Sequence, residues 1–182
     1  MKNIYISIIV LTLFGACKKE SNPFLISKSN IGLLTDSTQV KDIQAIYMND
    51  SVVKHLGRDE YTGSKNDIEV YDKFGNMLLI LSPKQALDST STISTIKVVD
   101  PRFKTKKGLN TESTFGDIKN NYTISSIQNT LRNVVVFVNE INGFFTIDKK
   151  ELPSELRLDM NKKIDALNIP DTAKIKYFMI GW

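Results

Sequence analysis

Residues 32–38 read Gly-Leu-Leu-Thr-Asp-Ser-Thr, and residues 108–114 read Gly-Leu-Asn-Thr-Glu-Ser-Thr, a similar pattern repeated at an offset of 76. An apolar set with the spacing i, i+3 and i+7 follows each motif closely. The two sets are Val40, Ile43 and Tyr47 in the first half, and Phe115, Ile118 and Tyr122 in the second. Such spacing places the side chains on one face of a helix, so each motif is expected to lead into a short helix.

The polar residues of the two motifs are of the kind that begin helices. Thr114 and Asp117 have the spacing of a capping box, in which each side chain accepts a hydrogen bond from the other residue's backbone amide. Asp36 and Gln39 would form a looser version in the first half. The alternative is that two exposed helix N-termini form paired anion sites. Capping accounts for every polar residue of the motifs, so we favour it.

Further matches follow in the same order along the chain. Residues 70–76 correspond to residues 137–143, and both contain an apolar run followed by Gly and Asn, with a second apolar run after them. This pattern predicts a β-hairpin in each half. Residues 96–99 correspond to residues 175–178, each as a closing strand. Ordered repetition of this kind indicates an internal duplication.

These elements predict an α+β fold. Two pseudo-repeats, residues 31–100 and 107–182, are each expected to form a short helix and an antiparallel meander. A single unit would bury one sheet face poorly, so the two should pack as one domain. The segment 153–167 stays open between an extra helix, with Met160, Ile164 and Leu167 at helical spacing, and a strand around residues 156–158.

The N-terminus has the features of an export signal. Lys2 precedes thirteen uncharged residues, Ile4–Ala16, too few for a membrane-spanning helix of about 20 residues. Residues 13–17 read Leu-Phe-Gly-Ala-Cys, which resembles the bacterial lipoprotein signal, in which the cysteine is acylated and becomes the first residue of the mature chain. We therefore expect a signal peptide over residues 1–16 and lipidation of Cys17. The alternative is an ordinary secreted protein with a free cysteine.

Composition excludes several classes of site. The 182 residues contain one His and one Cys, which cannot build a multi-histidine metal site, an internal disulfide or a four-cysteine zinc site. Lys and Arg number 24 against 20 Asp and Glu, and cleavage after residue 16 removes Lys2, which leaves 23 − 20 = +3. Such a mild charge does not indicate a nucleic-acid partner. No metal or cofactor is expected. Residues 17–30 are expected to form a tether before the domain.

The densest run of positive charge lies at the join between the two halves. The functional interpretation is contact with anionic envelope components such as lipid headgroups or lipopolysaccharide. The alternative is a solvated connection between the repeats. The residues concerned are Lys97, Arg102, Lys104, Lys106 and Lys107.

Catalytic candidates are sparse. His55 is the only histidine and lies in an alternating run that resembles a surface strand. The carboxylate pairs that could act as acid and base have no support beyond proximity in sequence. They are Asp59 with Glu60, Asp67 with Glu69, and Glu151 with Glu155. We therefore expect no catalytic residues, with a hydrolase acting through His55 or carboxylates as the alternative.

The chain resembles the sigma-E-regulated lipoproteins, a family of Gram-negative envelope lipoproteins defined by a domain of unknown function. The resemblance rests on residues 32–38, 93–100, 108–118 and 171–182, which recur in the same order after a lipoprotein signal. The whole sequence also resembles small lipoproteins of flavobacteria and their relatives. The resemblance implies an envelope location and an α+β domain, and it implies no reaction.

Together these observations predict a lipid-anchored module of the cell envelope. The outer membrane is the expected membrane, and the side that the domain faces stays open. The partners expected are the membrane, through the lipid anchor, and an envelope protein or polymer that the sequence does not identify. We expect the domain to serve binding or envelope maintenance and not catalysis.

Lipidation of Cys17 is directly testable. Cys17→Ala removes the only thiol in the sequence, so the variant should carry no acyl chain and should leave the membrane fraction. Each buried acyl methylene contributes about 0.8 kcal/mol to membrane binding, so loss of the acyl chains removes this binding free energy. Metabolic labelling with palmitate and cell fractionation measure the two effects. A variant that still fractionates with membranes would refute lipid anchoring at this residue.

Overall fold

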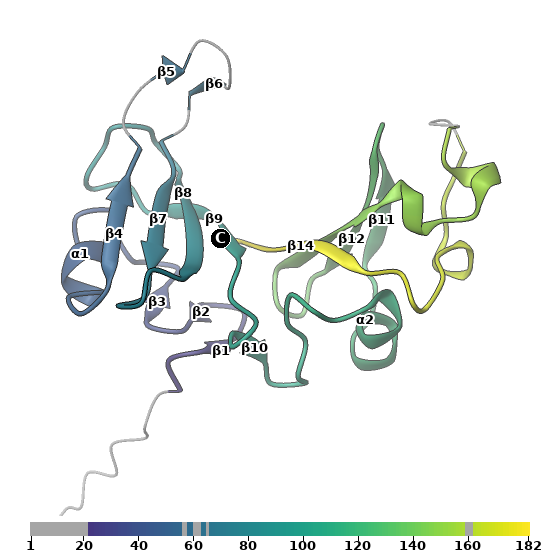
Figure 1. The fold of residues 1–182 in the computed structure, drawn as a ribbon, viewed down its shortest axis with the longest axis horizontal. Coiled ribbons are helices and arrows are strands. Elements are labelled where there is room, and N and C mark those ends of the chain that lie inside the picture. The colour runs from purple at the N-terminus through teal and green to yellow at the C-terminus, as the bar shows by residue number, and fades with distance from the viewer. Residues whose placement is uncertain (1–21, 56–57, 60–62, 65, 159–161) are drawn as a thin grey trace, which may run out of the picture.

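The computed structural model describes residues 22–55, 58–59, 63–64, 66–158 and 162–182, and it has an α+β fold. An eight-stranded antiparallel sheet runs the length of the molecule (Figure 1). In spatial order its strands are β11 (Ser126–Asn129), β12 (Asn133–Val138), β13 (Gly143–Asp148), β14 (Ile175–Gly181), β9 (Ile93–Val98), β8 (Met77–Pro83), β7 (Ile68–Tyr71) and β4 (Ser51–Lys54). The predicted α+β class is confirmed.

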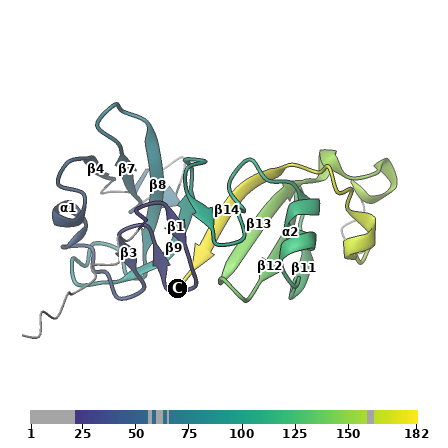
Figure 2. The same cartoon turned by 90° about the horizontal axis from the view of Figure 1, so that it is seen from below.

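Each half of the chain contributes four adjacent strands, and the two sets meet where β9 pairs with β14. In that pairing Val98 lies opposite Phe178 and Ile96 lies opposite Ile180. Figure 2 shows the two sets side by side, with β14 passing from the second set to the first. The hairpins predicted in each half are confirmed as β7–β8 and β12–β13. A common origin of the two halves stays a prediction.

The hairpin turns explain the repeated Gly/Asn pair of the sequence. Gly75 in the β7–β8 turn has φ 84°, and Asn142 in the β12–β13 turn has φ 51°. This left-handed backbone is cheap for glycine and tolerated by asparagine, so these residues let the chain reverse within a few residues.

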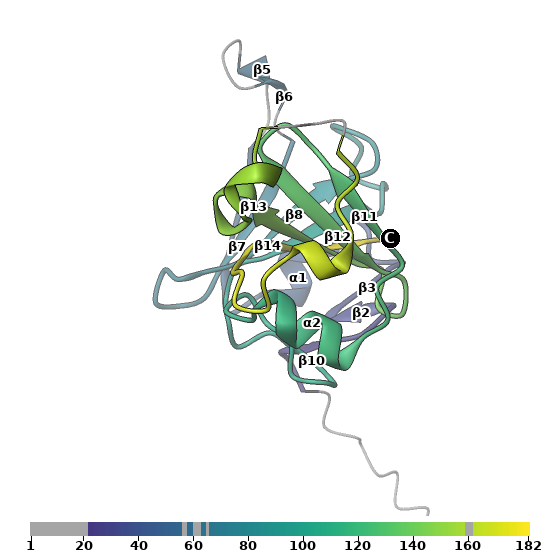
Figure 3. The ribbon, with the colours of Figure 1, turned by 90° about the vertical axis from the view of Figure 1, so that its right-hand side faces the viewer.

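The core lies on one face of the large sheet. Strand residues alternate between buried and partly exposed, as expected for a sheet covered on one side. Phe145 and Phe178 stack across β13 and β14 with ring centroids 4.6 Å apart. The other fully buried strand residues of this face include Val70, Leu79, Leu81, Ile96, Val134, Val136, Val138, Ile147 and Ile180. Seen along the long axis in Figure 3, α2 and strands of a smaller sheet lie below this sheet.

The two helices are α1 (Ile43–Ile46) and α2 (Phe115–Asn121), and no helix in the described part of the chain is long and apolar enough to cross a membrane. The apolar sets predicted to form helix faces, Val40 with Ile43 and Tyr47, and Phe115 with Ile118 and Tyr122, are all buried. The capping box of α2 is confirmed: Thr114 Oγ1 accepts from the Asp117 amide at 3.4 Å, and the Asp117 carboxylate accepts from the Thr114 amide at 2.8 Å.

The cap predicted for the first helix is wrong. The N-cap of α1 is Asp42, whose side chain makes no capping hydrogen bond, and Asp36 lies exposed well before the helix. The reason lies in the preceding backbone. Gln39 bridges Thr92, and the amides of Val40 and Lys41 donate to the carbonyls of Ser91 and Ser89, so this stretch pairs with a neighbouring loop and cannot continue a helix from Asp36. The helix therefore begins only at Ile43, where the Ala45 amide donates to the Asp42 backbone carbonyl.

A four-stranded small sheet joins the N-terminal segment to the middle of the chain. Its strands, in spatial order, are β10 (Lys104–Thr105), β1 (Leu25–Ile26), β2 (Asn30–Ile31) and β3 (Leu34–Thr35), with β1 and β10 parallel. Residues 25–30, predicted as tether, therefore belong to the domain, because Ile26 is buried in the core with Ile31. Residues 17–21 of the predicted tether lie outside the described residues.

In its described residues, the long connection before β14 shows neither the α-helix nor the strand considered for it. It contains three short 3₁₀ turns: η1 (Lys149–Glu151), η2 (Ser154–Leu156) and η3 (Ala166–Asn168). Ile164 is buried while Leu167 is 97% exposed, so the expected apolar face does not exist; Met160 lies outside the described residues. Isolated residues such as Leu152, Leu156 and Ile169 reach the core instead. A short two-stranded sheet, β5 (Arg58–Asp59) with β6 (Gly63–Ser64), completes the described elements.

The difference between the two helix starts gives a matched pair of variants. Thr114→Ala should lower the free energy of unfolding by about 1 kcal/mol, because it removes the hydroxyl of the capping box. Asp42→Ala should cost clearly less, since Asp42 makes no side-chain capping bond. Urea unfolding followed by circular dichroism measures both. Equal losses in the two variants would contradict this account of the caps.

Candidate functional site

The structure separates the five positive residues predicted at the join. Arg102 is held by carboxylates: its Nε donates to Asp100 Oδ1 at 2.9 Å, and one terminal nitrogen donates to Asp100 Oδ2 at 2.7 Å and to Asp72 Oδ2 at 2.9 Å. The guanidinium also lies 4.8 Å from the centre of the Phe24 ring. Arg102 thus fastens the β7–β8 turn to the join, and its charge is already matched within the domain.

Asp72 is the centre of this arrangement. Burial opposes its ionisation, but the Asn76 side chain, the amides of Asn76 and Phe74, and Arg102 all donate to its carboxylate and hold its pKa at about 2. The pKa of Asp100 is lowered as well, chiefly by the hydrogen bonds from the Arg102 side chain. Two ionised carboxylates sharing one guanidinium form a structural clasp and leave no proton to transfer near neutral pH.

Lys97 and Lys107 are also engaged, on different sides of the molecule. Lys97 lies on β9 between the buried Ile96 and Val98, so its side chain is on the opposite, open face of the large sheet, with Nζ 4.1 Å from the centre of the Tyr177 ring. Lys107 Nζ donates to the Asn121 carbonyl at 2.6 Å and to Glu140 Oε2 at 3.1 Å. Neither ammonium is an isolated positive charge.

Lys104 and Lys106 remain exposed, and neither forms an ion pair with a residue of the described chain. Lys106 borders an open groove of about 440 Å³ between the β1–β2 turn, the end of β10 and the β12–β13 turn. Lys28, which the sequence analysis did not single out, borders the same groove and is exposed. The remaining lining residues are Ile26, Ser27, Ser29, Asn30, Lys107, Tyr122, Glu140 and Ile141.

We call this hollow the basic groove. Glu140 balances Lys107, so Lys28 and Lys106 supply its unmatched charge. The two lysines are far apart in sequence and meet because β1 pairs with β10, a long-range contact that no local pattern encodes. Trp182, the only tryptophan, donates from its indole Nε1 to the Lys28 carbonyl at 3.1 Å, which places it beside the groove.

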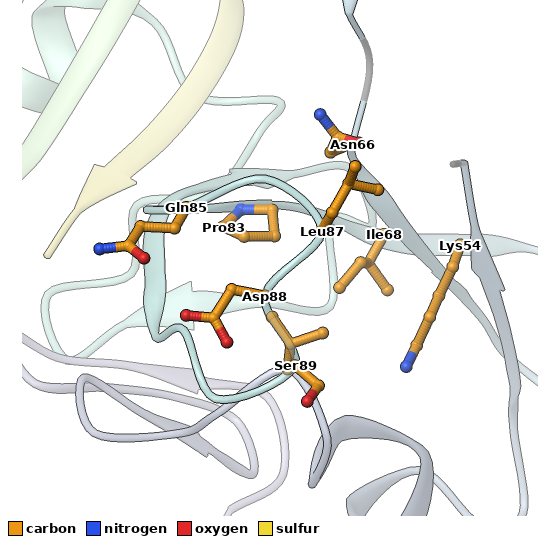
Figure 4. Close-up of a pocket in the computed structure, with 9 residues that line it drawn as sticks. Lys54, Asn66, Ile68, Pro83, Gln85, Leu87, Asp88 and Ser89 are labelled. Atoms are coloured by element: carbon orange, nitrogen blue, oxygen red, sulfur yellow. The ribbon is translucent and has the colours of Figure 1, made fainter. Parts of the chain in front are cut away.

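A second hollow, of about 240 Å³, lies beside the loop after β8 (Figure 4). Its apolar wall consists of Val40, Ile68, Pro83 and Leu87, and Lys54 and Asp88 are the charged residues at its rim. Leu87 has φ 62°, unusual for a bulky residue, and is 76% exposed. The hollow can hold a small apolar group, but its residues show no arrangement for catalysis.

His55 follows β4 at the surface. Its Nε2 lies 2.9 Å from Glu69 Oε2, and the Tyr71 hydroxyl donates to the same oxygen at 2.7 Å, a hydrogen bond that raises the pKa of Tyr71. Among the described residues, the hydrogen-bonding partners of His55 are the Glu69 carboxylate and the Asp67 carbonyl, and not a serine, threonine or cysteine side chain.

Of the three candidate carboxylate pairs, the two that the structure describes have separate hydrogen-bonding partners. Asp67 accepts from the Ser82 hydroxyl at 2.7 Å, whereas Glu69 pairs with His55. In the second described pair, Glu151 accepts from the Lys174 amide and Glu155 accepts from the Ser154 hydroxyl. Of the third pair, Glu60 and the Asp59 side chain lie outside the described residues. In the described part of the chain no three His, Cys, Asp or Glu residues cluster as metal ligands. Cys17 also lies outside the described residues.

Comparison with known proteins adds a fold relationship. No protein-family model and no curated protein sequence matches the chain. Among solved structures, it is similar to the crystal structure of the uncharacterized protein yfeY from Escherichia coli, with a TM-score of 0.55 and 14% sequence identity. The alignment covers 86% of this chain and 99% of that one. At so low an identity the likeness concerns the fold alone.

The Arg102 clasp predicts a pH-dependent loss of stability. Arg102→Gln should lower the free energy of unfolding at pH 7, and the difference from the wild type should shrink as the pH falls from about 4 to 2. The folded pKa of Asp72, about 2, lies below the value near 3.9 of an unfolded aspartate, so ionised Asp72 stabilises the fold above that range and loses this effect on protonation. Urea unfolding across this range measures it. Lys104→Gln, at an exposed neighbour without an ion pair, is the control, and a pH-independent difference for Arg102→Gln would contradict the assignment.

Proposed function

We propose that this protein is a lipid-anchored lipoprotein of the bacterial cell envelope whose domain is a non-catalytic binding module. Its ligand is an anionic, phosphate-bearing envelope component, and the basic groove is the contact surface. The lipid anchor on Cys17 keeps the module at a membrane, which we propose is the outer membrane.

The proposal for the anchor rests on the sequence. The only cysteine stands directly after the small residues that end a short apolar signal, where a lipoprotein signal requires it. The resemblance to the sigma-E-regulated lipoproteins supports the same location. The fold relationship to yfeY is compatible with it and says nothing about the membrane.

The single observation that carries the binding proposal is that Lys28 and Lys106 line one groove. Both residues are exposed and lack ion-pair partners in the described chain, although the groove also contains the neutralised Lys107–Glu140 pair. Two unmatched lysines beside a concave surface attract a multiply charged anion such as a phosphate, because charge-assisted hydrogen bonds are stronger than neutral ones. The groove therefore retains Lys106 and Lys107 of the basic join, without Lys97, Arg102 and Lys104.

The alternative is an envelope hydrolase acting through His55. One observation favours it: the 2.9 Å pair with Glu69, since a carboxylate orients the imidazole in hydrolase triads. The lack of a nucleophile among the described contacts of His55 weighs against it. Turnover of a chromogenic ester that disappears in His55→Gln would favour this alternative over a binding module.

The position of Trp182 makes the basic groove testable. Titration of the mature lipoprotein in nonionic detergent with inorganic pyrophosphate should change the tryptophan fluorescence in a saturable manner, since Trp182 is hydrogen-bonded to the Lys28 backbone. The double variant Lys28→Gln, Lys106→Gln should bind at least about tenfold more weakly, because a hydrogen bond to a charged group contributes about 1.5 kcal/mol or more.

The matched control is Lys162→Gln, Lys163→Gln, which removes the same charge from exposed residues of the connection before β14 and should leave the affinity unchanged. If the control weakens binding as much as the groove variant, net charge and not the groove attracts the anion, and the proposed site is wrong. Competition by vesicles containing phosphatidylglycerol or by lipopolysaccharide then separates the two natural sources of phosphate.

A further inference from the structure

Two exposed apolar side chains lie together at one end of the first half of the domain. Leu33 is 45% exposed and Phe74 is 77% exposed, and both line a shallow hollow of about 200 Å³. We call Leu33 and Phe74 the Phe74 patch. Large exposed apolar side chains that gather in this way mark interaction surfaces more often than isolated ones do.

Phe74 is held in place at the tip of the β7–β8 turn. The Asp72 carboxylate accepts from the Phe74 amide at 2.9 Å and from the Asn76 amide at 3.0 Å, and Arg102 fixes Asp72 from the other side. Gly75 provides the left-handed residue that the turn needs. The turn therefore presents an aromatic ring to solvent from a backbone that is tied down on both sides.

The N-terminal segment is fastened beside this patch. Pro23 and Phe24 line the same hollow as Phe74. The Phe24 carbonyl accepts from the Lys104 amide at 2.9 Å, and its ring packs on Phe103 with centroids 5.1 Å apart. Gly32 packs so closely on Pro23 that a Cβ there would lie 2.3 Å from the Pro23 carbonyl oxygen. The chain is thus attached to the domain from about Pro23 onward.

The length of chain before this attachment limits how far the patch can be from a membrane. Five residues lead from Cys17 to Asn22, and a fully extended chain of that length spans at most about 18 Å. If Cys17 carries the lipid, the surface around Pro23 is the part of the domain held nearest to the bilayer. Leu33 and Phe74 belong to that surface.

We propose that the Phe74 patch docks onto the lipid bilayer and sets the orientation of the anchored domain. This inference rests on the proposed lipidation of Cys17. Phe74 enters the boundary between headgroups and acyl chains, while Lys73, whose Nζ lies 5.0 Å from the centre of the Phe74 ring, contacts lipid phosphates. Asp72 in the hollow shares Arg102 with Asp100, and Asp50 is the other carboxylate lining the hollow, so apolar contact and not net positive charge carries the docking.

The single cysteine of the sequence makes the docking measurable. Acylation consumes the Cys17 thiol, so a cysteine introduced elsewhere is the only free thiol of the mature lipoprotein. Phe74→Cys and Leu33→Cys place an environment-sensitive fluorophore in the patch. Leu131→Cys and Leu167→Cys place it at exposed apolar positions of the other half, 66% and 97% exposed. Each labelled protein is reconstituted into vesicles of phosphatidylethanolamine with a minority of phosphatidylglycerol.

The emission from positions 33 and 74 should shift to the blue and should be quenched by lipids that carry a nitroxide on the acyl chain. Emission from positions 131 and 167 should show neither effect. Anchored protein that floats with the vesicles but shows no shift or quenching at positions 33 and 74 would overturn the docking while leaving the anchor intact; a patch that binds a protein partner gives this result. Protein that does not float would refute the lipid anchor, and the docking with it.

Discussion

The pairing of β9 with β14 is the interaction on which the rest of this structure depends. It converts two four-stranded sets into one sheet with a continuous buried face, and Ile96, Val98, Phe178 and Ile180 all lie on that face. Without this pairing, β9 and β14 would each be an exposed edge strand. Each four-stranded set would also have only one short helix to cover its apolar face. The 4.6 Å stacking of Phe145 on Phe178 then continues the core into the second half. Both helices, the small sheet and the join are positioned against this shared layer.

Much of this architecture follows from local patterns in the sequence. The burial of the two apolar sets, the two hairpins and the capping box at Thr114 were predictable, because each depends on residues close to one another in sequence. The start of α1 was not, because residues 39–41 pair with the loop at residues 89–92 and the helix begins only at Ile43. The helix and the strand considered for the segment 153–167 are absent from its described residues for a related reason: its buried apolar residues pack one at a time into the core and do not share a helix face.

The candidate site was less predictable than the fold. Proximity in sequence suggested one basic group of five residues, Lys97, Arg102, Lys104, Lys106 and Lys107. In the structure, the pleat of β9 places the Lys97 side chain on the open face of the large sheet, and two carboxylates bind Arg102. Lys28 joins Lys106 only through the parallel β1–β10 pairing, which no short-range signal reveals. The clasp around Asp72 has a second role that charge counting would miss, since it stiffens the turn that carries Phe74.

The parallel pairing of β1 with β10 also has a consequence for the order of folding. Ile26 can pair early with Ile31 of β2, which is close in sequence. Leu25 and Ile26 find their other partners, Lys104 and Thr105, only after the 78 residues between Ile26 and Thr105 have been brought together. Contacts this distant in sequence form late, because the intervening loop must close first. The N-terminal segment is therefore fastened to the middle of the chain late in folding, when most of the first half already has its structure.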